Sequence, residues 1–155
     1  GGAVSISSEH ERGTRVTITL PGPRGRRVFV ADHDAGTQAA AADTLRRAGY
    51  LVTEAEDGDL ALYLLSGAET DAVVLDVGMP GRDGLAVLAE LGEGPPVVVV
   101  TGDQLDEDAL RDVYGGVAAL LRKPALEPDL LRAVARAMRF EWPGHRYPTV
   151  TSSHG

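Results

Sequence analysis

The 155-residue sequence contains no cysteine, and only one of its fifteen basic residues is a lysine. Without cysteine, disulfide scaffolds, cysteine-ligated zinc sites and thiol catalysis are excluded. No apolar run approaches the roughly 20 residues that a membrane helix needs, and the amino terminus does not read as a secretory signal. Aromatic residues make up only 5%, yet the hydrophobic share of 43% is too high for a wholly disordered chain. The sequence therefore predicts one soluble globular domain.

Negative charge is concentrated in the middle of the chain. Residues 28–140 carry nine basic and twenty acidic residues, a balance of −11, whereas residues 1–27 carry five Arg and two Glu. Such a surface repels a phosphate backbone, so we expect no nucleic-acid binding. It favours a cation site or a basic partner instead. The lone Lys123 offers a compact ammonium that arginine cannot replace, although chance explains a single lysine equally well in an arginine-rich chain.

From residue 28 onward, short apolar runs alternate with segments of helical period, which is the pattern of βα units. Asp34 is placed to cap the first helix, and Gly49 to end it in a left-handed conformation. Five units predict an open, doubly wound α/β sheet with five helices, whose sites lie at the carboxyl ends of the strands. The predicted strands are 28–31, 51–55, 72–75, 97–100 and 118–121, and the predicted helices are 35–48, 58–65, 84–91, 104–114 and 126–140.

Polar side chains follow four of the five predicted strands. Each of them alone is better explained as a cap or a strand residue, but their convergence on one edge favours a functional site. Carboxylates hold Mg²⁺ and can be phosphorylated, while a hydroxyl and an ammonium bind phosphoryl oxygens. The pattern predicts chemistry on a phosphoryl group with a divalent cation. The residues are Asp32, His33 and Asp34 after the first strand, Asp76 after the third, Thr101 after the fourth and Lys123 after the fifth.

Three segments resemble the receiver domain of bacterial two-component response regulators, over residues 28–140. The resemblance implies a flavodoxin-like, doubly wound, five-stranded parallel sheet of order 2-1-3-4-5 with five helices. The segments are Leu75-Asp76-Val77-Gly78-Met79-Pro80-Gly81-Arg82-Asp83-Gly84, Val100-Thr101-Gly102 and Arg122-Lys123-Pro124.

The same resemblance implies roles for the site residues. Asp76 accepts a phosphoryl group, Thr101 reports its presence and Lys123 binds it. Mg²⁺ is held by Asp32, Asp76 and the backbone carbonyl of Gly78. The peptide bond after Lys123 is expected to be cis, and the Asp76 carboxylate is expected to face solvent at the end of its strand.

Two positions depart from the family pattern. The family ends its first strand with two adjacent acids, whereas this chain has Asp32-His33. Imidazole suits transition metals better than Mg²⁺, so we expect weak Mg²⁺ binding or replacement by Mn²⁺. Asp32 through a water, Asp34 after a local shift, or His33 itself completes the site. The alternative, which we favour, is that His33 is a tolerated loop residue in a weakened site. Leu120 replaces an aromatic switch residue, so a signal from Thr101 must travel by packing or helix displacement.

The amino-terminal segment, residues 1–21, resembles the closing β-hairpin of a sensor histidine kinase ATP-binding domain, with its Gly-Thr and Leu-Pro pairs. The nucleotide-binding boxes are absent, so this fragment lacks the kinase ATP site. The order implies a hybrid histidine kinase, with a linker over 22–27, the receiver over 28–140 and a flexible tail over 141–155. An isolated hairpin is marginal in water, so we expect residues 1–21 to be mobile or paired with a partner's sheet. The alternative is a basic tail with accidental alternation.

The leading hypothesis is a phosphoacceptor receiver in a phosphorelay. It takes a phosphoryl group from a histidine-kinase core, in cis or in trans, onto Asp76, and catalyses its own modification and hydrolysis. We expect a downstream histidine phosphotransfer protein as a further partner. We also expect a cytoplasmic location without membrane contact, and we leave open whether the chain forms a homodimer. One alternative is a phosphorylation-independent pseudo-receiver, motivated by His33 and Leu120. Another is a small phosphatase of the haloacid-dehalogenase type, with Asp32 and Asp34 as an Asp-x-Asp motif.

Overall fold

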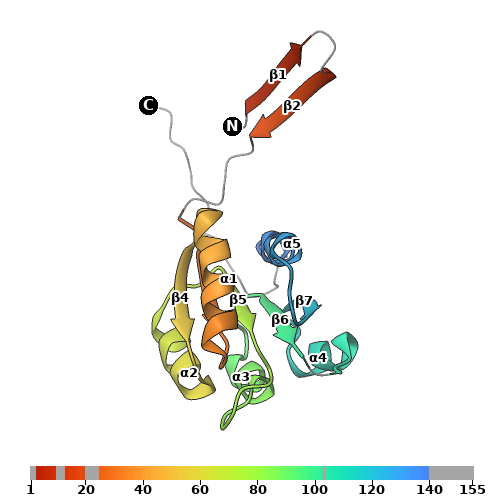
Figure 1. The fold of residues 1–155 in the computed structure, drawn as a ribbon. Coiled ribbons are helices and arrows are strands. Elements are labelled where there is room, and N and C mark those ends of the chain that lie inside the picture. Colours follow the sequence, from red (N-terminus) through yellow and green to blue (C-terminus); the bar gives the residue numbers. More distant parts are fainter. Residues whose placement is uncertain (1–2, 10–12, 20–24, 103, 140–155) are drawn as a thin grey trace, which may run out of the picture.

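The computed structural model contains two separate sheets, one of two strands and one of five (Figure 1). The two-stranded sheet pairs β1 (Ala3–Glu9) with β2 (Gly13–Thr19) in antiparallel register. A hairpin is therefore present where the amino-terminal alternation predicts one. The structure describes residues 3–9, 13–19, 25–102 and 104–139.

The five-stranded sheet is parallel throughout and has the order β4-β3-β5-β6-β7. Numbered among themselves, these strands run 2-1-3-4-5, which confirms the predicted topology. Its strands are β3 (Arg27–Ala31), β4 (Leu51–Ala55), β5 (Ala72–Leu75), β6 (Val97–Thr101) and β7 (Val117–Arg122). The helices are α1 (Ala35–Arg47), α2 (Gly58–Gly67), α3 (Gly84–Leu91), α4 (Glu107–Val113) and α5 (Glu127–Ala137).

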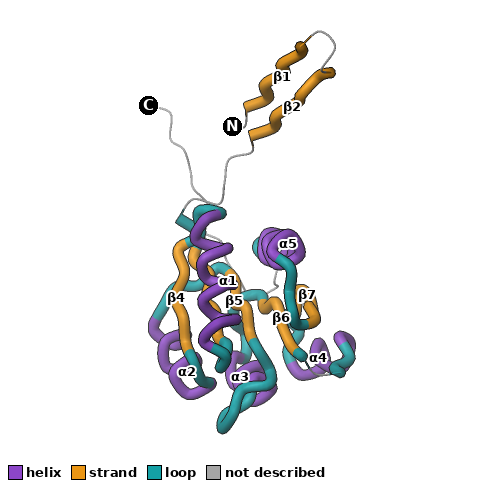
Figure 2. The backbone as a smooth tube through the Cα atoms, viewed as in Figure 1, coloured by secondary structure: helices purple, strands orange, loops and turns teal. Residues whose placement is uncertain are grey.

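Helices cover both faces of this sheet, which explains why β3, β5 and β6 are almost continuously apolar. Side chains of adjacent strand residues point to opposite faces. Val28 and Val30 therefore pack with Leu45 of α1 and Val134 of α5 in one cluster, whereas Phe29 joins the other cluster with residues of α2, α3 and α4. Figure 2 shows the strands enclosed between these helices. The result is a doubly wound sheet with one apolar core on each face.

Most predicted boundaries agree with the structure, and two helices are corrected. The sequence predicts that the fourth helix begins at Gln104, but α4 begins at Glu107. Asp106 is its N-cap, because the Asp106 carboxylate accepts the amide of Asp108 at 2.8 Å. The last helix ends at Ala137, short of the predicted residue 140, which lies outside the described residues. Gly49 has the predicted positive φ, at 99°.

Aspartates cap four of the five helices at the amino ends, each accepting a backbone amide within the first turn. In a parallel βα fold these helix amino ends follow the carboxyl ends of the strands. Part of the acidic excess is therefore explained by capping and by the positive end of each helix dipole. The capping residues are Asp34, Asp57, Asp83 and Asp106.

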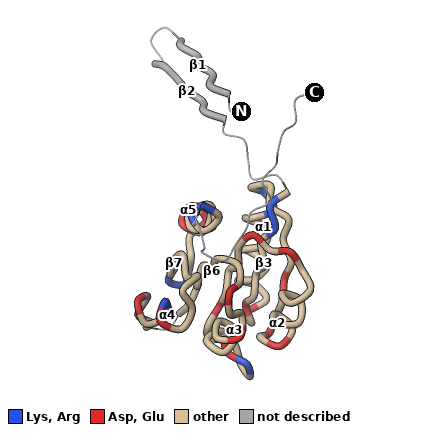
Figure 3. The backbone as a smooth tube through the Cα atoms, turned by 180° about the vertical axis from the view of Figure 1, so that it is seen from behind, with Lys and Arg blue, Asp and Glu red and all other residues tan. Residues whose placement is uncertain are grey.

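Acidic positions are spread over several helices and loops in Figure 3, and the basic positions are dispersed among them. Within the described part of the chain, basic side chains make ion pairs with carboxylates from α1 to α5. Among the described helices, none has both the length and the apolar character required to traverse a membrane.

Candidate functional site

The carboxyl ends of four strands bring the predicted site residues to one edge of the sheet. Asp32 follows β3, Asp76 follows β5, Thr101 ends β6 and Lys123 follows β7. Asp32, Asp76 and Thr101 are 5%, 2% and 0% exposed, so this edge places polar groups in a buried setting. Buried charges of this kind require partners.

The Asp76 carboxylate is surrounded by three donors. Its Oδ2 atom lies 3.0 Å from the Lys123 ammonium and 2.8 Å from Nδ1 of His33, and its Oδ1 atom accepts the amide of Gly78 at 2.9 Å. The expectation that Asp76 faces solvent is wrong. The carboxylate is buried because the following loop and Lys123 fold over the end of β5.

These donors decide the protonation state of Asp76. Burial by itself raises the pKa of this carboxyl, but the Gly78 amide, the Lys123 ammonium and His33 together hold its pKa below the ordinary value. Burial likewise opposes the charged form of Lys123, yet its hydrogen bonds to Asp32 and Asp76 raise its pKa above the ordinary value. Asp76 is therefore a carboxylate, and Lys123 an ammonium, over the whole neutral range.

Lys123 bridges the two buried carboxylates, at 2.8 Å from Asp32 Oδ2 and 3.0 Å from Asp76 Oδ2. We expect Lys123→Met to lower the free energy of unfolding at neutral pH by about 1.5–3 kcal/mol, the contribution of hydrogen bonds to charged groups. Asp76, with its lowered pKa, contributes stability above about pH 4 that is lost as pH falls through the folded-state pKa. Lys123, with its raised pKa, contributes stability below about pH 10.4 that is lost as pH rises through its folded-state pKa.

Denaturant unfolding of the parent and Lys123→Met proteins across pH 3–11 tests this expectation. The stability difference should form a plateau between those limits and shrink at both ends. A difference that stays constant through both ends would contradict a charge-based role for Lys123. Arg132→Met is a suitable control, because Arg132 is 77% exposed and, among the described residues, contacts Asp129 and Pro128 of its own helix.

His33, rather than Asp34, is the residue of the β3–α1 loop that contacts Asp76. The Asp34 carboxylate is occupied at the start of α1, where its Oδ1 atom accepts the Thr37 amide at 2.7 Å and the Thr37 hydroxyl at 2.8 Å. These bonds lower the pKa of Asp34. The loop is held to β4 by Gln38, whose amide donates to the carbonyl of Ala55 at 2.6 Å.

Sequence reasoning missed Gln38 as a positioning residue. Its role depends on the carbonyl of Ala55, which ends a neighbouring strand, so no spacing within α1 reveals it.

The predicted cis peptide bond between Lys123 and Pro124 is present. Leu120 lies in β7, pairs with Val99 of β6 and packs against the cluster beneath α2, α3 and α4. Transmission of a signal by packing at Leu120 stays a prediction.

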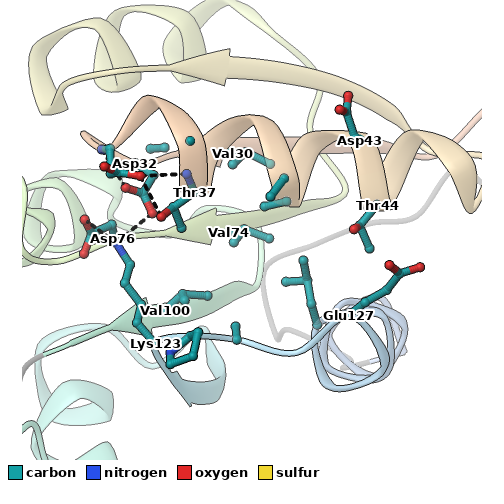
Figure 4. A pocket seen from close by; sticks show the side chains of 18 of the residues that line it. Val30, Asp32, Thr37, Asp43, Thr44, Val74, Asp76, Val100, Lys123 and Glu127 are labelled. Carbon is teal, nitrogen blue, oxygen red and sulfur yellow. Dashed lines mark hydrogen bonds and ion pairs between the residues drawn. The ribbon is translucent and has the colours of Figure 1, made fainter.

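A groove of about 830 Å³ runs from the acidic site along the face between α1 and α5. Figure 4 shows Val30, Val74 and Val100 along its floor, with Asp76 and Lys123 at one end. The α1 side of the groove carries small residues, namely Gly36, Thr37, Ala40, Ala41 and Thr44. The other end lies beside the ion pair between Arg47 and Glu127, whose closest atoms are 2.9 Å apart.

A divalent cation suits part of this donor set. Asp32 and Asp76 form a buried acidic pair, and both offer the oxygen donors that Mg²⁺ prefers. The third potential ligand is Nδ1 of His33, and one atom from each of these three residues lies within 4.8 Å of the others. The nitrogen donor does not suit Mg²⁺. The pocket thus keeps two carboxylates for a divalent cation but offers a nitrogen where a third oxygen ligand would suit Mg²⁺.

Comparisons with known proteins agree with this geometry. The family model of the response regulator receiver domain matches residues 28–135. The transcriptional regulatory protein PdtaR of Mycobacterium tuberculosis is 35% identical over 133 residues, which is 84% of this chain and 62% of that protein. The response regulator MprA of Mycolicibacterium vanbaalenii is 34% identical over 116 residues, which is 73% of this chain and 50% of that protein. The chain thus spans between half and two thirds of these relatives.

Solved structures give the same fold. The chemotaxis protein CheY4 of Vibrio cholerae aligns with a TM-score of 0.68 and 25% identity, covering 73% of this chain and 98% of that one. A receiver domain protein of Methanospirillum hungatei, at 22% identity, has a TM-score of 0.68 and covers 74% of this chain and 94% of that one. Fold and site define a member of the two-component signalling proteins. The chain belongs to the response regulator receiver domain family.

Proposed function

We propose that the predicted receiver, residues 28–140, acts as a phosphoacceptor that takes a phosphoryl group from a kinase phosphohistidine onto Asp76. The observation that supports this proposal most strongly is the environment of Asp76, a buried carboxylate whose oxygens contact the Lys123 ammonium and the Gly78 amide. Its lowered pKa keeps it in the nucleophilic form at neutral pH. An aspartate that stood at the strand end exposed to solvent would not require such surroundings.

In the proposed reaction, a carboxylate oxygen of Asp76 attacks the phosphorus of the phosphohistidine. A phosphorus–oxygen bond forms, the phosphorus–nitrogen bond breaks, and the imidazole leaves with the electron pair and takes up a proton. Transfer of this kind depends on positioning and on charge stabilisation. Lys123 stands beside the reacting carboxylate and stabilises the phosphoryl oxygens, while Thr101, at the end of the adjacent strand β6, reports the phosphoryl group.

The groove between α1 and α5 supports this role, because it provides an approach to the acceptor. Asp76 is 2% exposed, and the groove ends at Asp76 and Lys123. Its apolar floor and small α1 residues suit an apolar surface of the kinase core, which brings the phosphohistidine to the mouth of the site. A downstream histidine phosphotransfer protein also presents a histidine side chain, so it would reach Asp76 through the same groove.

The hairpin that precedes the receiver favours a hybrid histidine kinase as the parent protein. β1 and β2 pair over seven residues each, from Ala3 with Thr19 to Glu9 with Gly13, so an antiparallel hairpin stands where the resemblance to a kinase ATP-binding domain predicts one. Residues 22–26 then serve as the linker, one residue fewer than the sequence predicts because Arg27 begins β3, and the predicted tail over 141–155 lies outside the described residues. A kinase that acts in cis and a cytoplasmic location follow from this organisation, and a homodimer is compatible with it.

Exposure to acetyl phosphate, followed by intact mass measurement and peptide mapping, tests the proposed function. Parallel reactions with Mg²⁺ and with Mn²⁺ separate an inactive acceptor from an unsuitable cation. A single phosphoryl adduct on Asp76 is the expected result. An adduct on Asp32 would favour the phosphatase alternative, and no adduct with either cation would favour the pseudo-receiver.

A further inference from the structure

The cation pocket of this receiver contains an imidazole as well as carboxylates. Nδ1 of His33 lies 2.8 Å from Asp76 Oδ2 and 3.9 Å from Asp32 Oδ1. The His33 side chain is 42% exposed, whereas the two aspartate side chains are 6% and 2% exposed. The ring therefore lies over the solvent side of the two carboxylates, where an entering cation meets all three groups.

The net charge of the pocket is small. Asp32 and Asp76 contribute two negative charges, and Lys123 hydrogen-bonds to both and cancels one of them. A carboxylate at position 33 would restore the second negative charge, but a neutral imidazole does not. Coulomb attraction, on which Mg²⁺ depends, is therefore weaker here. The choice of cation then depends more strongly on the nitrogen donor, which binds transition metals better than Mg²⁺.

We propose that Asp32, His33 and Asp76 form a site that selects a nitrogen-accepting divalent transition ion, of the Zn²⁺ class, over Mg²⁺. The Nδ1 atom that shares a proton with Asp76 can share a dication with it instead, because the nitrogen and the carboxylate oxygen already face each other. Mn²⁺, which prefers carboxylate and water but takes a nitrogen ligand more readily than Mg²⁺, falls between the two. The proposal deepens the proposed function, on which it rests for the use of the bound ion in phosphoryl transfer.

Almost any protein site with nitrogen and oxygen donors binds Zn²⁺ more tightly than Mg²⁺. The decisive quantity is therefore the change in the Mg²⁺-to-Zn²⁺ ratio of dissociation constants when His33 is replaced. His33→Asp should strengthen Mg²⁺ binding and weaken Zn²⁺ binding, and so lower that ratio by about tenfold or more. His33→Ala should weaken Zn²⁺ binding without strengthening Mg²⁺ binding.

Titration of Mg²⁺ and Zn²⁺ into the isotope-labelled full chain, followed through amide NMR shifts, measures these constants at the site itself. The Gly78 amide, which donates to Asp76, is the local reporter. Site-local reporting matters because His10, His145 and His154 can bind Zn²⁺ elsewhere. Since His33 is partly exposed, its replacement leaves the core unchanged, and unshifted amides of buried residues such as Val98 verify the fold.

The proposal is supported if Zn²⁺ shifts the Gly78 amide in the parent chain and the ratio falls in His33→Asp. An unchanged ratio, or no site-local shift with Zn²⁺, overturns it. These readouts involve no phosphorylation, so they are separate from the acetyl phosphate experiment. Loss of the Asp76 adduct with both cations, together with the expected ratio, would refute the proposed function and leave the metal preference standing.

Discussion

Asp76→Asn is expected to lower phosphoryl incorporation to background, a loss of about a thousandfold or more, because an amide oxygen does not act as the nucleophile that the carboxylate provides. The fold should persist. Asn has the same shape, its oxygen can still accept the Gly78 amide, and Lys123 keeps its 2.8 Å contact with Asp32. The change in the free energy of unfolding should stay within about 1.5–3 kcal/mol, the range for hydrogen bonds to charged groups.

Radiolabel transfer from a phosphorylated histidine-kinase core measures the first effect, and thermal unfolding followed by circular dichroism measures the second. Asp59→Asn is the matched control. It makes the same chemical change on α2, where the side chain is 76% exposed and pairs with Arg82 outside the site. Labelling of Asp76→Asn at the level of this control would show that the acceptor lies elsewhere.

Gly84→Ala is expected to lower the free energy of unfolding by about 2–3 kcal/mol, towards the upper end of the range for overpacked positions. Gly84 begins α3 directly against the acceptor strand, and its amide donates to the carbonyl of Val77 at 3.2 Å. A methyl group added there would lie 2.5 Å from the carbonyl oxygen of Asp76 and 2.5 Å from Cα of Val77. These are backbone atoms, so relief requires a shift of α3 or of the loop that carries Asp76.

Gly67→Ala provides the matched control, because it ends α2 and an added methyl group there meets nothing within 4 Å. It should leave stability within about 0.5 kcal/mol of the parent, as surface substitutions usually do. Thermal melts of the two variants measure the contrast, since each kcal/mol shifts the midpoint by about 4 °C in a domain of about 100–150 residues. Equal melting temperatures for Gly84→Ala and the parent would show that the close approach at α3 carries no energetic cost.

The order of strands and helices was predictable from local pattern. The apolar runs of β3, β5 and β6, the capping aspartates and the positive φ of Gly49 all act within a few residues of the chain. Parallel topology then places the ends of these strands together, so the convergence of Asp32, Asp76, Thr101 and Lys123 also followed from sequence. The start of α4 was misjudged, because acidic residues favour both a cap and a first turn.

The electrostatics of the site were decided only by the tertiary structure. Burial of Asp76, and the bridge that Lys123 makes between Asp32 and Asp76, depend on how two distant loops close over β5. Backbone geometry decides which side chain of the β3–α1 loop contacts Asp76. Asp34 caps α1, so its carboxylate accepts the Thr37 amide, and the His33 imidazole is the group that faces Asp76. Sequence spacing predicts which residues lie at the carboxyl-terminal edge of the sheet. The hydrogen-bond distances of about 3 Å between their atoms are determined by packing across the sheet.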